Sequence, residues 1–265
     1  MGCGMSRDKN KAQPRAPRQA RARQQRAPLN IGAPTEVSIH IPRNRTYPHG
    51  VPIPPTTHEI DRPTLENALT LTAGYLHRRN AQLTVIAVGG AINIIFLNTR
   101  NSTHDVDIFG SNLDIAARML LDEAMRYTIQ QSPSPLGTDW MNTENQMWLS
   151  PSLHRELTDE AIQQDVTVFN SPGLRVLAAP WEYAFSGKVQ RQLTGGNQVR
   201  PYDLSDTVHY LNRIINPRGG SGGRPVPMAT VKEWARRFNH ATNRNFLMNR
   251  VNVEYRRRYG SNGIV

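Results

Sequence analysis

The chain has 265 residues and a formal net charge of +11 at pH 7, a length that allows one substantial domain or two small ones. Its single cysteine, Cys3, excludes an intrachain disulfide, and no stretch reaches the ~18 apolar residues of a transmembrane helix. Residues 1–60 and 216–265 are strongly basic, whereas residues 61–215 carry more acidic than basic side chains. The two ends therefore favour anionic partners, either nucleic acid or a lipid surface.

Proline, arginine, glutamine and alanine dominate residues 1–58. This composition predicts a disordered basic arm, because it cannot bury a hydrophobic core. The first residues fit the pattern M-G-x-x-x-[ST], with Gly2 after the initiator methionine and Ser6 at its end. Gly2 is therefore a candidate myristoylation site, and Cys3 beside it is a candidate palmitoylation site.

Stable membrane anchoring needs a second signal, because a single myristoyl chain binds weakly and reversibly. Cys3 offers one, and the basic side chains that follow offer another, each worth up to ~1 kcal/mol near an anionic leaflet. These basic residues are Arg7, Lys9, Lys11, Arg15, Arg18, Arg21, Arg23 and Arg26. The start MGCGMS also resembles the dually acylated start of heterotrimeric G-protein α subunits. We expect attachment to the cytoplasmic side of a membrane; the alternative is an unmodified cytoplasmic tail that contacts RNA.

Helices and strands alternate from about residue 62 onward. Apolar residues at helical spacing behind a proline predict a helix over 62–81. The β-branched, uncharged run 83–88 predicts a buried strand. A second strand is expected at 105–109, and an amphipathic helix at 112–131. Between the two strands, residues 91–98 predict a short helix packed on the sheet.

The second half of the chain continues the α/β pattern and then becomes helical. Helical character near 157–164 precedes two strands, and two helices come next, before a flexible glycine- and proline-rich segment and a basic helical end. The expected strands are 165–169 and 174–179, and the expected helices are 180–193 and 201–216. The sequence thus predicts an α/β (α+β) fold with a small mixed sheet and a helical C-terminal part. We expect a core domain at 59–215, a linker at 216–227 and a basic helical segment at 228–265.

Two aspartates interrupt the second of these strands. Side chains alternate along a strand, so Asp105 and Asp107 point to the same side and Val106 to the other. Two carboxylates this close repel each other, and both remain ionised most easily around a divalent cation. Mg²⁺ fits such a pair, because it prefers oxygen ligands and is often completed by substrate phosphates.

A double glycine, Gly89-Gly90, ends the first strand just before the expected helix. A glycine turn at this place lets backbone N–H groups approach a phosphate at the positive end of a helix dipole. Together, the glycine turn and the carboxylate pair predict chemistry on a nucleotide phosphate.

The array G-G-x-A…R-x-x-T-x-D-x-D resembles the polymerase-β-like nucleotidyltransferase superfamily, and most closely its minimal branch of abortive-infection-type toxins. The matching residues here are Gly89, Gly90, Ala91, Ile92, Arg100, Thr103, Asp105 and Asp107, within a similarity that covers roughly residues 65–215. The resemblance implies that Asp105 and Asp107 bind Mg²⁺ or Mn²⁺ and that the glycines hold phosphates. It also implies a third carboxylate on a later strand, for which Asp165 is the candidate as a metal ligand and catalytic residue.

The same resemblance implies a lysine and a D-L-x-D helix in the helical part. Lys188 matches the lysine and is a candidate nucleotide-binding residue, while Asp203 and Asp206 match the helix. A simpler explanation of Asp203 and Asp206 is stabilisation of a helix N-terminus by negative charge. Likewise, Lys188 fits an ordinary solvated helix position.

Simpler structural explanations also exist for the other candidate residues. Asp105 and Asp107 fit a solvated edge strand, Gly89-Gly90 an ordinary tight turn, and Asp165 the end of a strand or helix. His104 beside Asp105 raises the alternative of a histidine–aspartate phosphohydrolase, with further ligands at His77, His154 and His209. An EF-hand is excluded, because no D-x-D-x-D-G loop with a closing glutamate is present.

The expected function is Mg²⁺-dependent transfer of a nucleoside monophosphate from an NTP to a hydroxyl acceptor, which is a protein, a tRNA or a small molecule. The alternative is an inactive nucleotidyltransferase-fold adaptor, anchored at a membrane or bound to nucleic acid. The basic C-terminal segment carries aromatic residues among its arginines, a composition seen in RNA-binding proteins. The alternatives are a packing helix whose charged face is solvated and a second contact with membrane phosphates.

Overall fold

The computed structural model describes residues 1, 56–143, 149–220 and 222–265. The chain divides into two units, Met1–Val37 and Ser38–Val265, and every described residue except Met1 belongs to the second. The predicted lipidation sites Gly2 and Cys3 and the basic arm behind them lie outside the described residues. In the described part of the chain, no helix combines the length and apolar character needed to cross a membrane.

A five-stranded mixed sheet forms the centre of the second unit, which confirms the predicted α/β fold class. In spatial order its strands are β5 (Met141–Asn142), β4 (Val106–Phe109), β2 (Leu83–Val88), β7 (Leu174–Ala178) and β6 (Thr167–Ser171). Strand β2 is antiparallel to β4 and parallel to β7, and β4 is parallel to β5. Two short strands, β1 (Ile60–Asp61) and β3 (Ser102–Thr103), form a separate pair.

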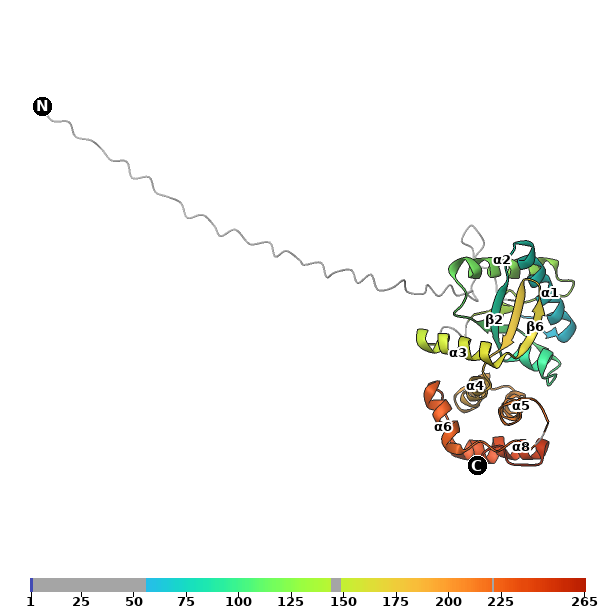
Figure 1. Cartoon of the computed structure of the whole chain (residues 1–265), viewed down its shortest axis with the longest axis vertical. Coiled ribbons are helices and arrows are strands. Elements are labelled where there is room, and N and C mark those ends of the chain that lie inside the picture. The colour runs from blue at the N-terminus through green and yellow to red at the C-terminus, as the bar shows by residue number, and fades with distance from the viewer. Residues whose placement is uncertain (2–55, 144–148, 221) are drawn as a thin grey trace. The chain divides into compact units, whose positions relative to one another are not determined.

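Helices cover both faces of the sheet (Figure 1). Helices α1 (Arg62–Arg78) and α2 (Ile115–Gln131) pack together against one face, and α3 (Pro151–Gln164) lies on the other. Aspartates cap both helices of the first pair, Asp61 at α1 and Asp114 at α2, each accepting a backbone N–H as helix starts require.

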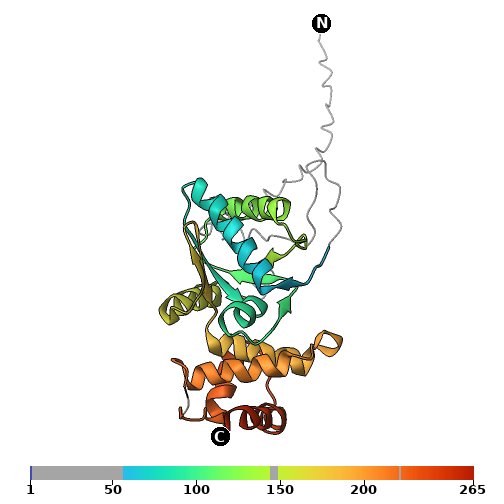
Figure 2. The same ribbon diagram turned by 90° about the vertical axis from the view of Figure 1, so that its right-hand side faces the viewer.

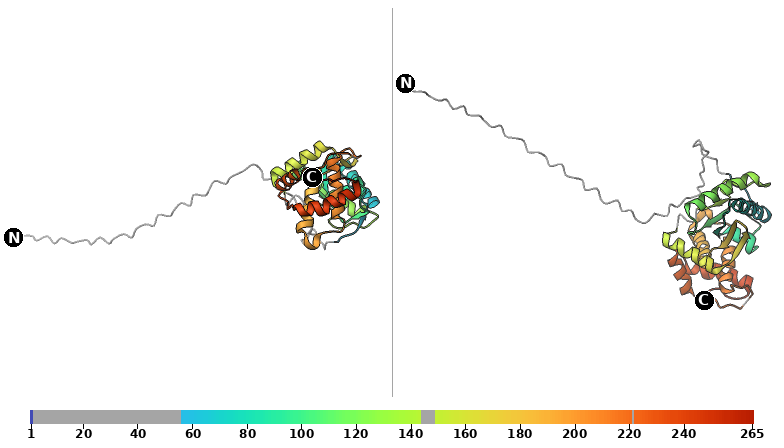
Figure 3. Two further views of the ribbon diagram at one scale, coloured as in Figure 1. Left: turned by 90° about the horizontal axis from the view of Figure 1, so that it is seen from below. Right: turned by 45° about the horizontal axis from the view of Figure 1, so that its top comes forward.

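The C-terminal part forms a helical layer at one end of the sheet (Figures 1 and 2). Its main helices are α4 (Trp181–Thr194), α5 (Asp203–Ile215), α6 (Met228–Arg237) and α8 (Asn252–Tyr259). Short helical turns η3 (Gly196–Gln198), α7 (Arg244–Phe246) and η4 (Leu247–Val251) connect them. Helix α4 packs on α5, α6 packs on α4, and α8 packs on α5, so the orange and red helices cover this end of the molecule (Figure 3).

The segment between α5 and α6, expected as a flexible linker, bonds to neighbouring residues in its described part. The backbone N–H of Val226 donates to Gly263 O at 2.8 Å, and that of Val265 donates to Val226 O at 3.0 Å. Gly223 N donates to the side chain of Asn216 at 3.0 Å. The chain terminus therefore lies beside the start of α6.

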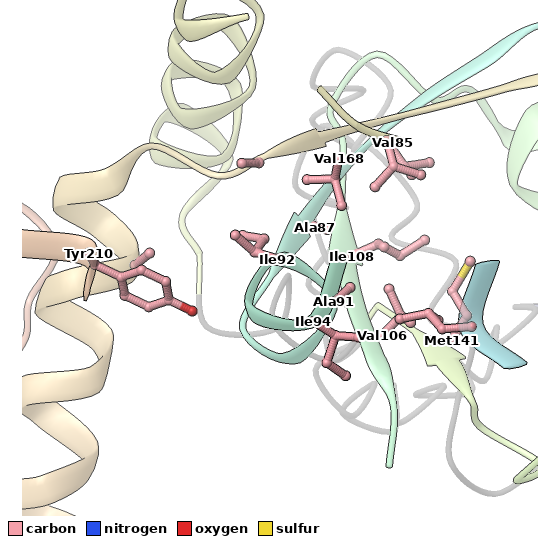
Figure 4. Packing of buried hydrophobic residues seen from close by; sticks show 14 of the residues in the cluster. Val85, Ala87, Ala91, Ile92, Ile94, Val106, Ile108, Met141, Val168 and Tyr210 are labelled. Atoms are coloured by element: carbon pink, nitrogen blue, oxygen red, sulfur yellow. The ribbon is translucent and has the colours of Figure 1, made fainter. Parts of the chain in front are cut away.

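One predicted helix differs in kind from the observed one. Residues 92–96 form a π-helix, η1 (Ile92–Phe96), between β2 and β3. Its wider turn buries the amide side chain of Asn93 together with Ile92 and Ile94. Figure 4 shows Ile92 and Ile94 packed against the strands, with Tyr210 of α5 reaching toward them from the helical layer.

Candidate active site

A cavity of about 500 Å³ lies where the sheet meets the helical layer. Five of the predicted site residues line it: Gly89, Gly90, Asp105, Asp107 and Lys188. They come from the end of β2, the start of β4 and the middle of α4. Residues about 100 positions apart in the sequence thus face one space.

The carboxylates of Asp105 and Asp107 project from the start of β4. Val106 between them is fully buried on the opposite side, as strand alternation requires. Asp107 is paired with Val88 of β2 and with Asn142 of β5. The hydroxyl of Thr103 donates to Asp105 O at 3.0 Å, which fixes the backbone just before the strand.

The two glycines are each required by the backbone. Gly89 has φ of +75°, a conformation that residues with a Cβ rarely adopt. A Cβ on Gly90 would lie 2.1 Å from the hydroxyl oxygen of Thr103. Backbone conformation therefore explains Gly89 and packing explains Gly90, and the result is a cavity wall made of bare backbone.

Tyr210 ties the glycine turn to helix α5. The amide of Asn93 donates to the Tyr210 hydroxyl at 2.9 Å, and that hydroxyl donates to Gly89 O at 3.4 Å. The ring is fully buried (Figure 4). Burial, reinforced by the nearby Asp206 charge, raises the pKa of Tyr210 far above its usual value, so the hydroxyl keeps its proton and remains a donor.

Four charged side chains form a buried cluster beside the cavity. Lys188 Nζ lies 2.6 Å from Asp203 Oδ1 and 2.8 Å from Asp206 Oδ2. The guanidinium of Arg100 forms a two-pronged ion pair with Asp206, and the same group stacks on the ring of Tyr202 at 3.6 Å from its centroid. Two cations and two anions balance, so the cluster carries no net charge.

Contacts within the cluster also shift the pKa of two members, Asp203 and Arg100. Burial alone would raise the pKa of Asp203, but the charge and hydrogen bond of Lys188 outweigh it and hold that pKa below its usual value. For Arg100, burial acts to lower the pKa, and the hydrogen bond and charge of Asp206 reverse this effect and raise it. Asp203 and Arg100 are therefore charged at neutral pH.

An uncharged aromatic group forms another part of the cavity wall. Tyr183 of α4 packs against Phe238 and His240, with ring centroids 5.4 Å and 5.7 Å away. Burial, with a contribution from the charge of Asp107, raises the pKa of Tyr183 to about 12. Burial lowers the pKa of His240 to about 4, so both rings are neutral at pH 7.

Asp165 does not reach this cavity. It ends helix α3 with φ of +52°, and its carboxylate pairs with Arg175 while 66% of the side chain is exposed. Strands β2 and β7 separate β4 from β6, the strand that follows Asp165, so the structure corrects the expected position of a third carboxylate. The neighbours of β4 are β2 and β5, and in β5 Asn142 is adjacent to Asp107.

Metal ligation in this cavity therefore rests on two carboxylates. Within the described residues, no group of three or more His, Cys, Asp or Glu side chains is placed to hold a metal ion. The alternative histidines are also elsewhere: His154 accepts a hydrogen bond from Gly110 N at 3.2 Å, and His209 contacts Tyr259 at 2.9 Å. Neither histidine is among the residues that line the cavity.

Several cavity residues were not predicted from the sequence. Ala184, Gly187 and Arg191 are three of them, and together with the predicted Lys188 they form one face of α4 that lines the cavity. The sequence contained one indication of this face, Gly187. A glycine in the middle of a helix destabilises the helix by about 1 kcal/mol relative to alanine, so its presence there suggests a functional or packing role. Arg200, and Phe238 to His240 after α6, gave no such signal.

A second cavity, of about 560 Å³, meets the first at Asp105 and Arg200, which line both. Its other walls include Glu59, His104 and Asp139. Asp105 is therefore approachable from two sides, one with the glycine turn and one without it.

Comparison with curated proteins and with solved structures finds no match. A match to one protein family covers residues 58–262, which takes in the sheet, all residues that line the first cavity and the helices of the helical layer. The chain belongs to the family described as Domain of unknown function (DUF7582).

Proposed function

We propose that the protein is a Mg²⁺-dependent nucleotidyltransferase that moves a nucleoside monophosphate from an NTP to a hydroxyl acceptor. The observation that supports this proposal is the convergence of Gly89, Gly90, Asp105 and Asp107 on one cavity. Two carboxylates facing a turn of bare backbone suit a ligand that combines phosphates with a divalent cation.

The donor set fits the metal. Asp105 just before β4 and Asp107 within it both line the cavity and offer hard oxygen ligands, and these are the residues that would hold Mg²⁺ or Mn²⁺. When bound, such an ion neutralises phosphate charge and polarises the reacting phosphoryl group.

The chain's own residues bind and orient the two substrates. The glycine turn permits close approach of the phosphates, and the neutral rings of Tyr183 and His240 leave room for the uncharged part of the nucleotide. The acceptor approaches Asp105 through the second cavity. A bond forms between the acceptor oxygen and the α-phosphorus as the bond to pyrophosphate breaks, and the hydroxyl proton passes to solvent.

The test measures transfer of label from each of the four α-labelled NTPs to total host lysate, with Mg²⁺ or Mn²⁺. We expect Asp105→Asn and Asp107→Asn each to reduce transfer by about 100-fold or more, since metal-assisted stabilisation is worth several kcal/mol. Asp165→Asn is the matched control, because its carboxylate lies outside the cavity, and it should keep wild-type transfer. Retained activity in both cavity variants, with intact folding, would refute the proposal.

A second candidate function is that of an adaptor that binds partners without turnover. The observation that favours it concerns the expected third carboxylate of the metal site. Asp165, the candidate for it, lies away from the cavity, and the residue beside Asp107 in the neighbouring strand is an asparagine, Asn142. Measurement of the melting temperature with and without MgNTP distinguishes the two functions. A nucleotide-binding enzyme gains thermal stability in proportion to ligand concentration over Kd, whereas an adaptor that binds no nucleotide shows no shift.

A further inference from the structure

We infer that Arg191 and Arg200 are the anion-binding residues of the cavity and receive the terminal phosphates of the nucleotide, and that Lys188 and Arg100 do not. The identification of the anion as a nucleotide triphosphate rests on the proposed function above. The assignment of the two arginines rests on which of the cavity's positive charges are already neutralised.

Four cationic side chains line the cavity: Arg100, Lys188, Arg191 and Arg200. Two of these are engaged within the protein. Lys188 pairs with Asp203 and Asp206, and Arg100 pairs with both carboxylate oxygens of Asp206. The acidic partners neutralise both cations.

Release of these pairs to bind a phosphate is strongly unfavourable. The exposed fractions of the side chains are 5% for Arg100, 8% for Lys188, 0% for Asp203 and 1% for Asp206. A ligand that drew Lys188 away would leave buried carboxylates without their cation, which costs more than a surface ion pair returns. The backbone N–H of Arg200 also donates to Asp203 Oδ2 at 2.9 Å, which further fixes that aspartate.

Arg191 lies three residues beyond Lys188 on the same face of α4 and is half-buried at the cavity. In the part of the chain that the structure describes, its side chain makes no hydrogen bond and no ion pair, and its charge acts on Asp203 only as the last of several contributions that lower the pKa of that carboxyl. The guanidinium of Arg200 donates one hydrogen bond, to the neutral hydroxyl of Tyr202 at 2.9 Å. Both arginines thus keep a full positive charge and most of their donors for a ligand.

The resulting arrangement of charge matches a triphosphate with its metal. Asp105 and Asp107 are the anionic side chains at the sheet edge, and Arg191 and Arg200 are the cations on the helical side. Guanidinium groups bind phosphate oxygens in a two-pronged geometry that a lysine cannot reproduce. Phosphate oxygens that do not contact the metal ion at Asp105 and Asp107 can therefore bind to the two arginines.

The experiment measures binding of inorganic tripolyphosphate, of each NTP and of the matching NMP by calorimetry in the presence of Mg²⁺. Arg191→Gln and Arg200→Gln should each weaken tripolyphosphate and NTP binding by about 10- to 100-fold, as expected for loss of a charge-assisted contact. NMP binding should be unchanged, so the ratio of NTP affinity to NMP affinity should fall by the same factor. Arg250→Gln, an exposed arginine that does not line the cavity, is the matched control and should bind like wild type.

Unchanged tripolyphosphate affinity in both variants, with wild-type melting temperatures, would overturn the inference. If wild type bound tripolyphosphate through these arginines but bound no nucleotide, the anion site would stand and the proposed function would fall. If wild type bound neither probe, both would be refuted.

Discussion

Lys188 matches the lysine of the nucleotidyltransferase pattern, yet its surroundings give it a structural task. Its ammonium group lies between two buried carboxylates that belong to α5, 15 and 18 residues further along the chain. Asp203 and Asp206 stand in the first turn of α5, where negative charge also stabilises the helix. The match to a motif and the stabilising contact therefore concern the same three side chains.

We predict that Lys188→Met lowers the free energy of unfolding by about 3–5 kcal/mol, because buried Asp203 would lose its ion pair with Lys188 and Asp206 would keep only that with Arg100. Urea denaturation of the full chain measures this value. Lys232→Met, at an exposed position of α6, should change stability by less than about 0.5 kcal/mol. A loss below about 1 kcal/mol in the Lys188 variant would contradict the structural role.

At the scale of elements, the two glycines Gly90 and Gly187 beside the cavity differ in the space that a side chain would have. Gly90 sits where β2 meets η1 and has no space for a side chain, since a Cβ there would collide with Thr103. Gly187 lies inside α4, and a Cβ there would meet only His240 Cε1, at an ordinary contact distance of 3.7 Å.

Alanine substitutions at the two glycines should therefore change stability in opposite directions. Gly187→Ala should raise the free energy of unfolding by about 0.5–1 kcal/mol through helix propensity, and Gly90→Ala should lower it by about 1–3 kcal/mol through overpacking. Thermal unfolding of the two variants gives both signs. Two changes of the same sign would show that the packing at one of these glycines is not as described.

Regular elements were predictable to a large extent. The buried run of β2, the capped helices α1 and α2, and the α4–α5 pair follow from periodicity and capping residues, which act locally. Strand β5 was not predictable, because two residues, Met141–Asn142, carry no pattern. The prediction that Asp165 lies at the metal site was wrong for a related reason. A sequence shows that a strand exists but not where that strand lies in the sheet, and β6 after Asp165 is not a neighbour of β4.

The candidate site was predictable only in its local parts. Gly89-Gly90 and Asp105/Asp107 are visible in the sequence, because each pair has a fixed spacing along one segment. The neutralisation of Lys188, the free guanidinium of Arg191 and the contribution of His240 depend on how α4, α5 and α6 pack. No short-range pattern encodes that packing.

At the scale of the whole molecule, the helical layer completes the cavity that the sheet begins. Arg191 and Arg200 come from α4 and from the segment before α5, and Phe238 to His240 come from the segment after α6. The family match spans both parts. A sheet without its C-terminal helices would keep the two carboxylates but lack the cationic and aromatic walls.

The N-terminal arm, which lies outside the described residues, adds a prediction at this scale. If Gly2 is myristoylated as the sequence pattern indicates, Gly2→Ala should move the protein from the membrane fraction to the soluble fraction of a myristoylating host. Cell fractionation with immunoblotting measures this shift, and Ser38→Ala, far from the pattern, is the control. An unchanged membrane fraction would exclude acylation at Gly2 as the anchor.

The Tyr210 contact has a consequence for the entropy of ligand binding. A glycine with positive φ would ordinarily be the most mobile point of such a turn, yet the carbonyl of Gly89 accepts from a buried hydroxyl that Asn93 holds in place. The turn is therefore ordered before any ligand arrives. Less conformational freedom is lost when a phosphate binds, and a larger part of the contact energy remains as affinity.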